Sequence, residues 1–337
     1  MIKFFYLIVI FFGSTSLQAQ LSDFKSFNFT KADAKALQYK GESLENMPKL
    51  AYDLTYNLAT DVEKFRAIFI WVSTNIKYEY GFYLKNARVR KKFKNDSIKL
   101  AEWNKEFSLK VFKKLLKEQK TVCTGYAYLI KELSNLANIK CEIIDGYGRT
   151  ANDETLRLIV PNHSWNAVQL NNKWYLCDAT WSSGYYNANE YKFQYDFNDG
   201  YFLTDPNWFV KNHFPLDSKW LLTAKETQFS AFEKMPIMYN EAFKYKVFPM
   251  HSLKLRNEVV KNKEVVFFIK ALYSLEKKAI KIEIGSGKNS SLVQPIINEL
   301  SDGVFEIKHT FTTRGVYDVH FKMNEDYIFT YIVKVKK

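Results

Sequence analysis

A cysteine, a histidine and an aspartate in the middle of the chain have the types and spacing that thiol acyl transfer requires. Cys123 begins a short predicted helix, where the helix dipole and the free amides lower the pKa of a thiol and bind a developing oxyanion. Two predicted strands follow, joined by Asn171-Asn172, which is typical of a tight hairpin turn. His163 begins the first strand and Asp178 ends the second, so both are candidates to act on the cysteine.

Antiparallel pairing around this turn would bring His163 and Asp178 together. The two residues are about equally far from the turn, so we expect them near cross-strand register. The aspartate can then accept from one imidazole nitrogen and orient the other toward the sulfur of Cys123, whose proton the imidazole takes. Taken singly, such residues are usually an inert buried thiol, an ordinary strand histidine and a turn-forming aspartate. The three in this order favour a catalytic triad instead.

The motifs around these residues resemble the transglutaminase-like superfamily, whose core is a papain-type cysteine enzyme. They are Cys-Thr-Gly-Tyr-Ala from 123, His-Ser-Trp-Asn-Ala-Val from 163 and Trp-Tyr-Leu-Cys-Asp-Ala-Thr-Trp from 174. Further segments are similar to its kyphoscoliosis-peptidase branch: Ile70 to Tyr78, Tyr201 to Pro206, His213 to Pro215 and Trp220. The resemblance covers about residues 50–225. It implies that Cys123 is the nucleophile, His163 the general base and acid, and Asp178 the orienting carboxylate.

Two residues depart from the family pattern without removing a member of the triad. Thr121 stands where the family commonly has glycine two residues before the cysteine, and its side chain could tighten the approach to the helix. Cys177 replaces the usual aliphatic residue beside Asp178. We expect Cys177 to face away from that carboxylate, because neighbours on a strand point to opposite faces.

Other side chains near the triad are weaker candidates. Trp165, Trp181 and Tyr126 are candidates for substrate binding, with core packing an equal alternative for the two tryptophans. Cys141 and Cys177 could form a disulfide, but we expect two free buried thiols because another strand should separate them. The spacing of the other histidines is not that of metal ligands; they are His213, His251, His309 and His320. We therefore expect neither a metal nor a cofactor.

Patterns of apolar residues predict an α+β protein with two folded parts. Residues 21–120 are mostly helical, with a capping box formed by Thr60 and Glu63 and another helix over residues 106–118. A helix and a small antiparallel sheet follow, which by the resemblance form a transglutaminase- or papain-like core. From Val265 onward, alternating apolar residues predict a C-terminal Ig-like β-sandwich. The expected boundaries are a signal peptide at 1–19, a catalytic domain at 20–235 and a β-sandwich at 236–337.

Composition indicates a folded chain with one strongly basic segment. Of 337 residues, 47% are hydrophobic and 25% charged, which excludes a wholly disordered protein. The formal net charge is +13, and between Lys85 and Lys120 thirteen Lys and Arg face only four Asp and Glu. No stacking or recognition motif accompanies this segment, so nucleic acid is not expected as a partner. A solvated helical face or an insertion near an anionic cell envelope is favoured.

The first residues predict export. Lys3 supplies a positive start, residues 4–12 form an apolar run, and Leu17 and Ala19 suit the −3 and −1 positions of a signal-peptide cleavage site. No later stretch has the roughly 18 apolar residues of a membrane span. We therefore expect a protein that is periplasmic, bound at the cell surface or secreted, without a transmembrane segment.

These observations predict a cysteine acyl-transfer enzyme that forms a thioester on Cys123 and acts on a protein or peptide. Hydrolysis of the thioester would make it a peptidase or amidase, which we favour by analogy. Transfer to a lysine amine would make it a protein-crosslinking transglutaminase. The third hypothesis is a catalytically silent binding module of the cell envelope, against which the intact triad argues.

Overall fold

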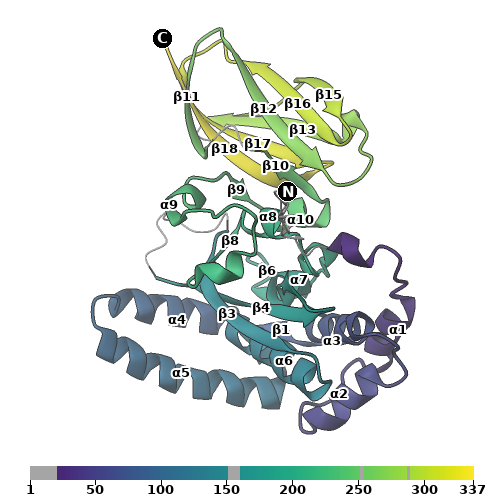
Figure 1. Ribbon diagram of the computed structural model, residues 1–337. Coiled ribbons are helices and arrows are strands. Elements are labelled where there is room, and N and C mark those ends of the chain that lie inside the picture. Colours follow the sequence, from purple (N-terminus) through teal and green to yellow (C-terminus); the bar gives the residue numbers. More distant parts are fainter. Residues whose placement is uncertain (1–20, 151–159, 251–253, 287–288) are drawn as a thin grey trace, which may run out of the picture.

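The computed structural model describes residues 21–150, 160–250, 254–286 and 289–337. The predicted signal peptide lies outside the described residues. Helices and a small sheet form the first part of the protein, and two further sheets form the last part (Figure 1). No helix among the described residues is long and apolar enough to cross a membrane. The predicted α+β class, a helical part with a small sheet followed by a sandwich, is therefore confirmed.

Helices dominate the chain up to the candidate nucleophile. They are η1 (Leu21–Phe24), α1 (Thr30–Gln38), α2 (Met47–Thr55), α3 (Asp61–Asn75), α4 (Tyr80–Lys92), α5 (Ser97–Glu118) and α6 (Cys123–Leu136). The predicted capping box is present at the start of α3, where Thr60 and Glu63 each bond the other's amide. Helix α5 begins at Ser97 rather than at residue 106, because the side chain of Asp96 caps it by accepting from the Lys99 amide.

Helices α4 and α5 form a hairpin that projects to one side of the molecule (Figure 1). The rings of Phe82 and Phe107 pack between them, and the Trp103 indole donates to the side chain of Asn86 at 2.9 Å. At the base of the hairpin, β1 (Lys77–Tyr78) and β2 (Lys120–Thr121) pair in parallel. Strand β2 ends two residues before Cys123, so the basic hairpin is anchored next to the candidate nucleophile.

A four-stranded antiparallel sheet carries the other candidate residues. Its order is β5 (Lys173–Cys177), β4 (His163–Leu170), β3 (Cys141–Gly148) and β8 (His213–Pro215). The turn between β4 and β5 has Asn171 and Asn172 at φ values of 48° and 61°, the left-handed pair that a type I′ hairpin needs. The predicted hairpin is therefore confirmed.

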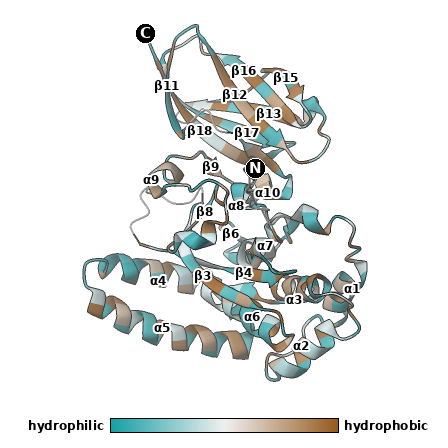
Figure 2. Cartoon of the chain, viewed as in Figure 1, coloured by the Kyte–Doolittle hydropathy of each residue, from teal (hydrophilic) through white to brown (hydrophobic). Residues whose placement is uncertain are grey.

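The two faces of this sheet are buried against different partners. On one face, Cys177 and Val168 pack with the buried residues of α3 and α6. On the other face, Trp165, Ala167 and Leu176 join a hydrophobic cluster that continues into the C-terminal sheets. This alternation follows the two-residue period of a strand. Figure 2 shows apolar residues on the central strands, between the helices below and the C-terminal sheets above.

Short elements connect the central sheet to the C-terminal part. They are α7 (Ala179–Ser183), β6 (Gly184–Asn187), β7 (Lys192–Tyr195), η2 (Asp199–Tyr201), α8 (Pro206–Phe209), η3 (Ser218–Leu221), α9 (Phe229–Phe232) and α10 (Asn240–Lys244). The segment from residue 199 to 213 passes beside the site, because Thr204 donates its amide to the carbonyl of Leu176 on β5.

The C-terminal part is a β-sandwich. One sheet has the order β10 (Val247–Pro249), β12 (Glu264–Ala271), β16 (Val304–Thr310) and β15 (Ile296–Ser301). The other has the order β11 (Arg256–Val260), β18 (Asp326–Lys336), β17 (Gly315–Met323), β13 (Ile280–Ser286) and β14 (Asn289–Val293), with η4 (Lys277–Ala279) before β13. Strand β9 (Ile237–Met238) also pairs with β18. Apart from the parallel pair β11–β18, neighbouring strands are antiparallel, as in the predicted Ig-like sandwich.

Candidate active site

The candidate nucleophile occupies the first turn of α6. Cys123 is the first residue of this 14-residue helix, and Val122 before it provides no side-chain cap. Since no cap occupies the first-turn amides, the helix dipole and these N–H groups can stabilise a thiolate or an oxyanion. The residue is 8% exposed, so only a small part of it is accessible from the surface.

Thr121 fits beside the helix because Gly125 has no side chain. Thr121 is fully buried. A Cβ atom on Gly125 would lie 1.9 Å from the Thr121 Oγ1, which no packing could tolerate. Thr121, two residues before Cys123, is thus accommodated because residue 125 is a glycine.

His163 and Asp178 meet, but not through the expected register. Nε2 of His163 lies 2.7 Å from Oδ2 of Asp178. The strands pair Asn166 with Cys177, so continued pairing would set Trp165, not His163, opposite Asp178. The prediction of near cross-strand register was wrong by two residues. Strand β5 ends at Cys177 and the chain turns into α7, which leaves Asp178 as a diagonal neighbour of His163.

The Asp178 carboxylate is surrounded by four donors. Its Oδ1 accepts from the amides of Thr180 at 2.8 Å and Trp181 at 3.2 Å, as the N-cap of α7. Its Oδ2 accepts from His163 and, at 3.1 Å, from Nε2 of His213. Burial alone would raise the pKa of Asp178, but the charge of His163 and the hydrogen bonds from both histidines hold that pKa well below its usual range.

His163 is held in the orientation that a thiol base requires. Because Nε2 is bonded to Asp178, Nδ1 is the nitrogen left for the Cys123 thiol. Burial acts to lower the pKa of His163, but the charge and hydrogen bond of Asp178, followed by the hydrogen bond and charge of Cys123, raise that pKa to about 10. At neutral pH the ring is therefore an imidazolium, the form that pairs with a thiolate.

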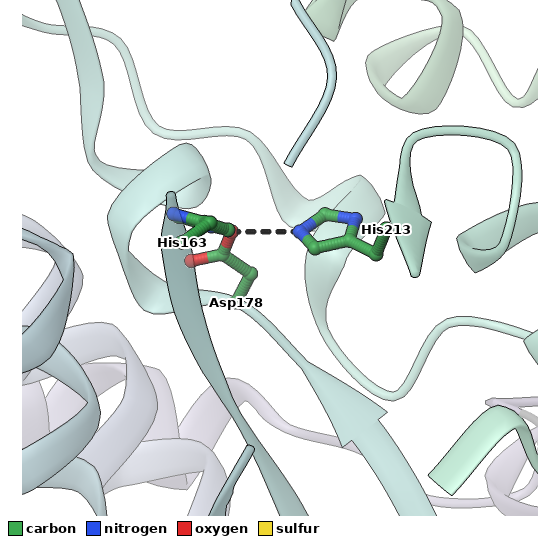
Figure 3. Close-up of side chains that lie close together, drawn as sticks. All are labelled: His163, Asp178 and His213. Atoms are coloured by element: carbon green, nitrogen blue, oxygen red, sulfur yellow. Dashed lines mark hydrogen bonds and ion pairs between the residues drawn. The ribbon is translucent and has the colours of Figure 1, made fainter. Parts of the chain in front are cut away.

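A third polar residue of the cluster, His213, was not singled out by the sequence analysis. It lies on β8, and Figure 3 shows its ring beside the Asp178 carboxylate, with a dashed line joining the two side chains. In the sequence, His213 was noted only as part of a His-Phe-Pro motif that is similar to the family, and its distance from the other histidines does not suit a metal site. The ligand atoms of His163, Asp178 and His213 lie within 4.8 Å of one another, so among the described residues they form the group that could hold a metal ion.

The three aromatic candidates have different surroundings. Trp181 is partly exposed and stacks on the His163 ring at 4.7 Å between centroids and 19° between planes. Trp165 is buried in the cluster shared with the sandwich. Tyr126 is fully buried and donates its hydroxyl to the carbonyl of Ile76 at 2.6 Å. We therefore keep Trp181 as the candidate substrate contact and assign Trp165 and Tyr126 to the core.

Tyr78 is a second neighbour that the sequence analysis did not assign to the site. It lies on β1 and pairs with Thr121 on β2, next to the start of α6. Burial is the main cause that raises the pKa of its hydroxyl, and the negative charge of Cys123 adds to it. The hydroxyl therefore stays protonated at neutral pH, as a donor close to the candidate nucleophile.

The other two cysteines are free and buried, as expected. Cys141 on β3 pairs with Val168 and Cys177 on β5 pairs with Asn166, so β4 separates them. Burial raises the pKa of the Cys141 thiol to about 12, and it also raises that of Cys177 far above its usual value. Both therefore remain protonated and inert under conditions in which an activated thiol reacts.

Comparisons with known proteins agree with this geometry. Residues 48–179 match the family model of the transglutaminase-like superfamily. The chain carries a transglutaminase-like domain. Over 221 residues it is 32% identical to the Kyphoscoliosis peptidase of Homo sapiens, a match that covers 65% of this chain and 30% of that protein. Over 235 residues it is 26% identical to Hillarin of Drosophila melanogaster, covering 64% and 26% of the two chains.

The transglutaminase-like domain is thus of the kyphoscoliosis-peptidase branch, as the motifs predicted. The chain spans less than a third of the length of these curated relatives. Among solved structures, the Lin-41 filamin domain matches 23% of this chain and 82% of its own, with 10% identity and a TM-score of 0.21. That score is too low for a structural inference, and the sandwich assignment rests on strand order alone.

Proposed function

We propose that this protein is a cysteine acyl-transfer enzyme in which Cys123, His163 and Asp178 are the catalytic residues. The observation that supports the proposal best is the 2.7 Å bond between His163 Nε2 and Asp178 Oδ2, which turns the other ring nitrogen toward Cys123 at the start of α6. The domain belongs to a superfamily that generally performs acyl transfer by a cysteine nucleophile. The specific reaction is part of the proposal.

The geometry supports a two-step reaction. The Cys123 thiolate attacks the carbonyl carbon of a peptide amide, and the backbone N–H groups at the start of α6 bind the oxyanion. The His163 imidazolium then gives its proton to the leaving amine, the C–N bond breaks, and a thioester remains on Cys123. In the second step neutral His163 takes a proton from water, which attacks the thioester and releases a carboxylic acid and the thiol.

Hydrolysis is the outcome that we propose for the second step. The human relative is named a peptidase, and this chain is 32% identical to it over 221 residues. If a lysine amine replaced water, the same thioester would give an isopeptide crosslink, which is the alternative activity. The two outcomes differ only in the acceptor, so the choice between them needs an assay that offers both acceptors together.

The basic hairpin favours a second candidate function, that of a binding module. Helix α4 has no acidic residue. Its five basic residues form no ion pair within the described part of the chain; they are Lys85, Arg88, Arg90, Lys91 and Lys92. Such a surface fits an anionic partner, and we propose the cell envelope, together with export by the N-terminal segment. The proposal of export rests on the residues before 20 alone.

The functions are separated by offering an unfolded protein substrate and a biotin-linked primary amine in one reaction. We expect new amino termini and no biotin on protein glutamines. The new amino termini should be lost in Cys123→Ala but not in the matched variant Cys141→Ala. Biotin incorporation that depends on Cys123 would establish the crosslinking enzyme instead. Absence of both products, with binding to anionic vesicles that salt abolishes, would establish the binding module.

A further inference from the structure

His213 reaches the candidate triad from a distant part of the chain. It begins β8, which pairs with β3 at the edge of the central sheet and sets His213 opposite Gly148. Its Nε2 lies 3.1 Å from Oδ2 of Asp178, the same oxygen that His163 contacts at 2.7 Å. The side chains of His213 and Asp178 are 0% and 1% exposed, so no water competes for this contact.

The His213 ring cannot turn away from the carboxylate. Phe209 stacks on it with centroids 3.9 Å apart and planes 19° apart, and Trp181 lies against it at 4.3 Å. Its Nδ1 is 2.7 Å from Oδ1 of the Asn212 side chain. With contacts on its ring face and both nitrogens, the imidazole is fixed in one orientation, which points Nε2 at Asp178.

The chemistry of this contact assigns the proton on His213. A carboxylate oxygen only accepts, so the Nε2 that faces Asp178 must carry a hydrogen. Burial is the main cause that lowers the pKa of His213 to about 4, although Asp178 acts to raise it. The titratable groups around the ring are Asp178 at the start of α7, His163 on β4 and Tyr201 on η2. The ring carries a hydrogen on Nε2, which it donates to Asp178.

We propose that His213 is a positioning residue, which fixes the ionised Asp178 carboxylate for His163 by donating a hydrogen bond from Nε2 to Oδ2. This hydrogen bond favours the ionised form of Asp178, whose negative charge stabilises the His163 imidazolium. The triad becomes a row in which His213 orients Asp178 and Asp178 orients His163. This role rests on the proposed function, because it matters for catalysis only if His163 serves Cys123.

Two substitutions at His213 separate a donor from a space-filling ring. His213→Phe keeps a flat apolar ring and loses the donor, whereas His213→Gln offers an amide N–H to Asp178. We expect His213→Phe to lower kcat about tenfold with KM unchanged. We also expect it to move the acid limit of the pH–rate profile up by about one pH unit, because losing one donor raises the pKa of the carboxylate. His213→Gln should keep most of the wild-type kcat and an acid limit close to that of the wild type.

Phe209→Leu is the matched control, since it loosens the stacking on the His213 ring and leaves the hydrogen bond in place. Thermal unfolding of each variant shows that the fold is kept. Equal changes in kcat and pH profile for Phe209→Leu and His213→Phe would reduce His213 to a packing role and overturn the proposal. Wild-type rates in His213→Phe would overturn it as well.

A nitrogen-15 NMR titration of the histidine rings tests the inference without any substrate. In the full chain at pH 5 to 8, we expect the signals that His213→Gln removes to be those of a ring that carries a hydrogen on Nε2. A ring without a hydrogen on Nε2, or a ring whose Nε2 binds a metal that a chelator removes, would overturn the proposal. If the NMR result is as expected but Cys123→Ala leaves amide cleavage unchanged, the proposed function fails and the contact between His213 and Asp178 stands.

Discussion

Asp178→Asn is the substitution that most sharply perturbs the site. Asparagine can still cap α7, because its amide oxygen accepts from Thr180 and Trp181 as Oδ1 of the aspartate does. The other end of the group would then be an NH2 facing the two histidines that now donate to Oδ2. To accept from this NH2, His163 must give up its proton on Nε2 and carry one on Nδ1, where it cannot receive the proton of the thiol.

The size of the effect follows from the pKa of His163, which the site raises to about 10 from an ordinary value of 6.5. That rise corresponds to ~5 kcal/mol in favour of the imidazolium. Asp178 contributes more to this rise than Cys123 does, so the pKa of His163 should fall well below 10 without the Asp178 charge. The equilibrium constant for proton transfer from Cys123 to His163 then falls by about tenfold for each unit by which the His163 pKa falls.

The rate of alkylation of Cys123 by iodoacetamide between pH 5 and 10 measures this equilibrium. The rate of the wild type at each pH is the reference. For Asp178→Asn we expect a rate at least about tenfold lower at pH 7 that rises with pH like that of an ordinary thiol. Asp145→Asn is the control, since this exposed carboxylate accepts only from Ser164 at the neighbouring strand end. A flat profile in Asp178→Asn would refute the account of His163.

Three further predictions follow from the same contacts. Gly125→Ala should abolish activity and lower the melting temperature, because the new Cβ would collide with Thr121 at 1.9 Å; an active, stable variant in a thermal-shift assay would contradict this packing. A reducing agent should leave the melting temperature unchanged, because Cys141 and Cys177 are free, and a lowered value would reveal a disulfide. Amide cleavage should persist through pH 9 and decline near pH 10, since His163 loses its proton there as pH rises; a decline near 6.5 would show an unperturbed histidine.

Local patterns predicted the parts of the site that are formed by neighbours in sequence. The capping box at Thr60 and the turn at Asn171-Asn172 depend on a few adjacent residues, and both were found. The cysteine at the start of α6 was predicted for the same reason, because a helix start is set by its own first turn.

The errors and omissions concern contacts between distant segments. The register of Asp178 depends on where β5 stops, and that point is fixed by the turn into α7 rather than by the hairpin. His213 reaches Asp178 only because β8 adds to the edge of the sheet beside β3, a pairing that no periodicity reveals. Trp165 belongs to the core because the sandwich covers its face of the sheet.

The central claim is that Cys123 carries the acyl group during turnover. Mass spectrometry of the full chain, quenched in acid while it cleaves an activated ester, tests this directly. The account predicts a species heavier by one acyl group, with the added mass on Cys123 and removed by hydroxylamine as a thioester is. Turnover without such a species, or an acyl group on another residue, would contradict it.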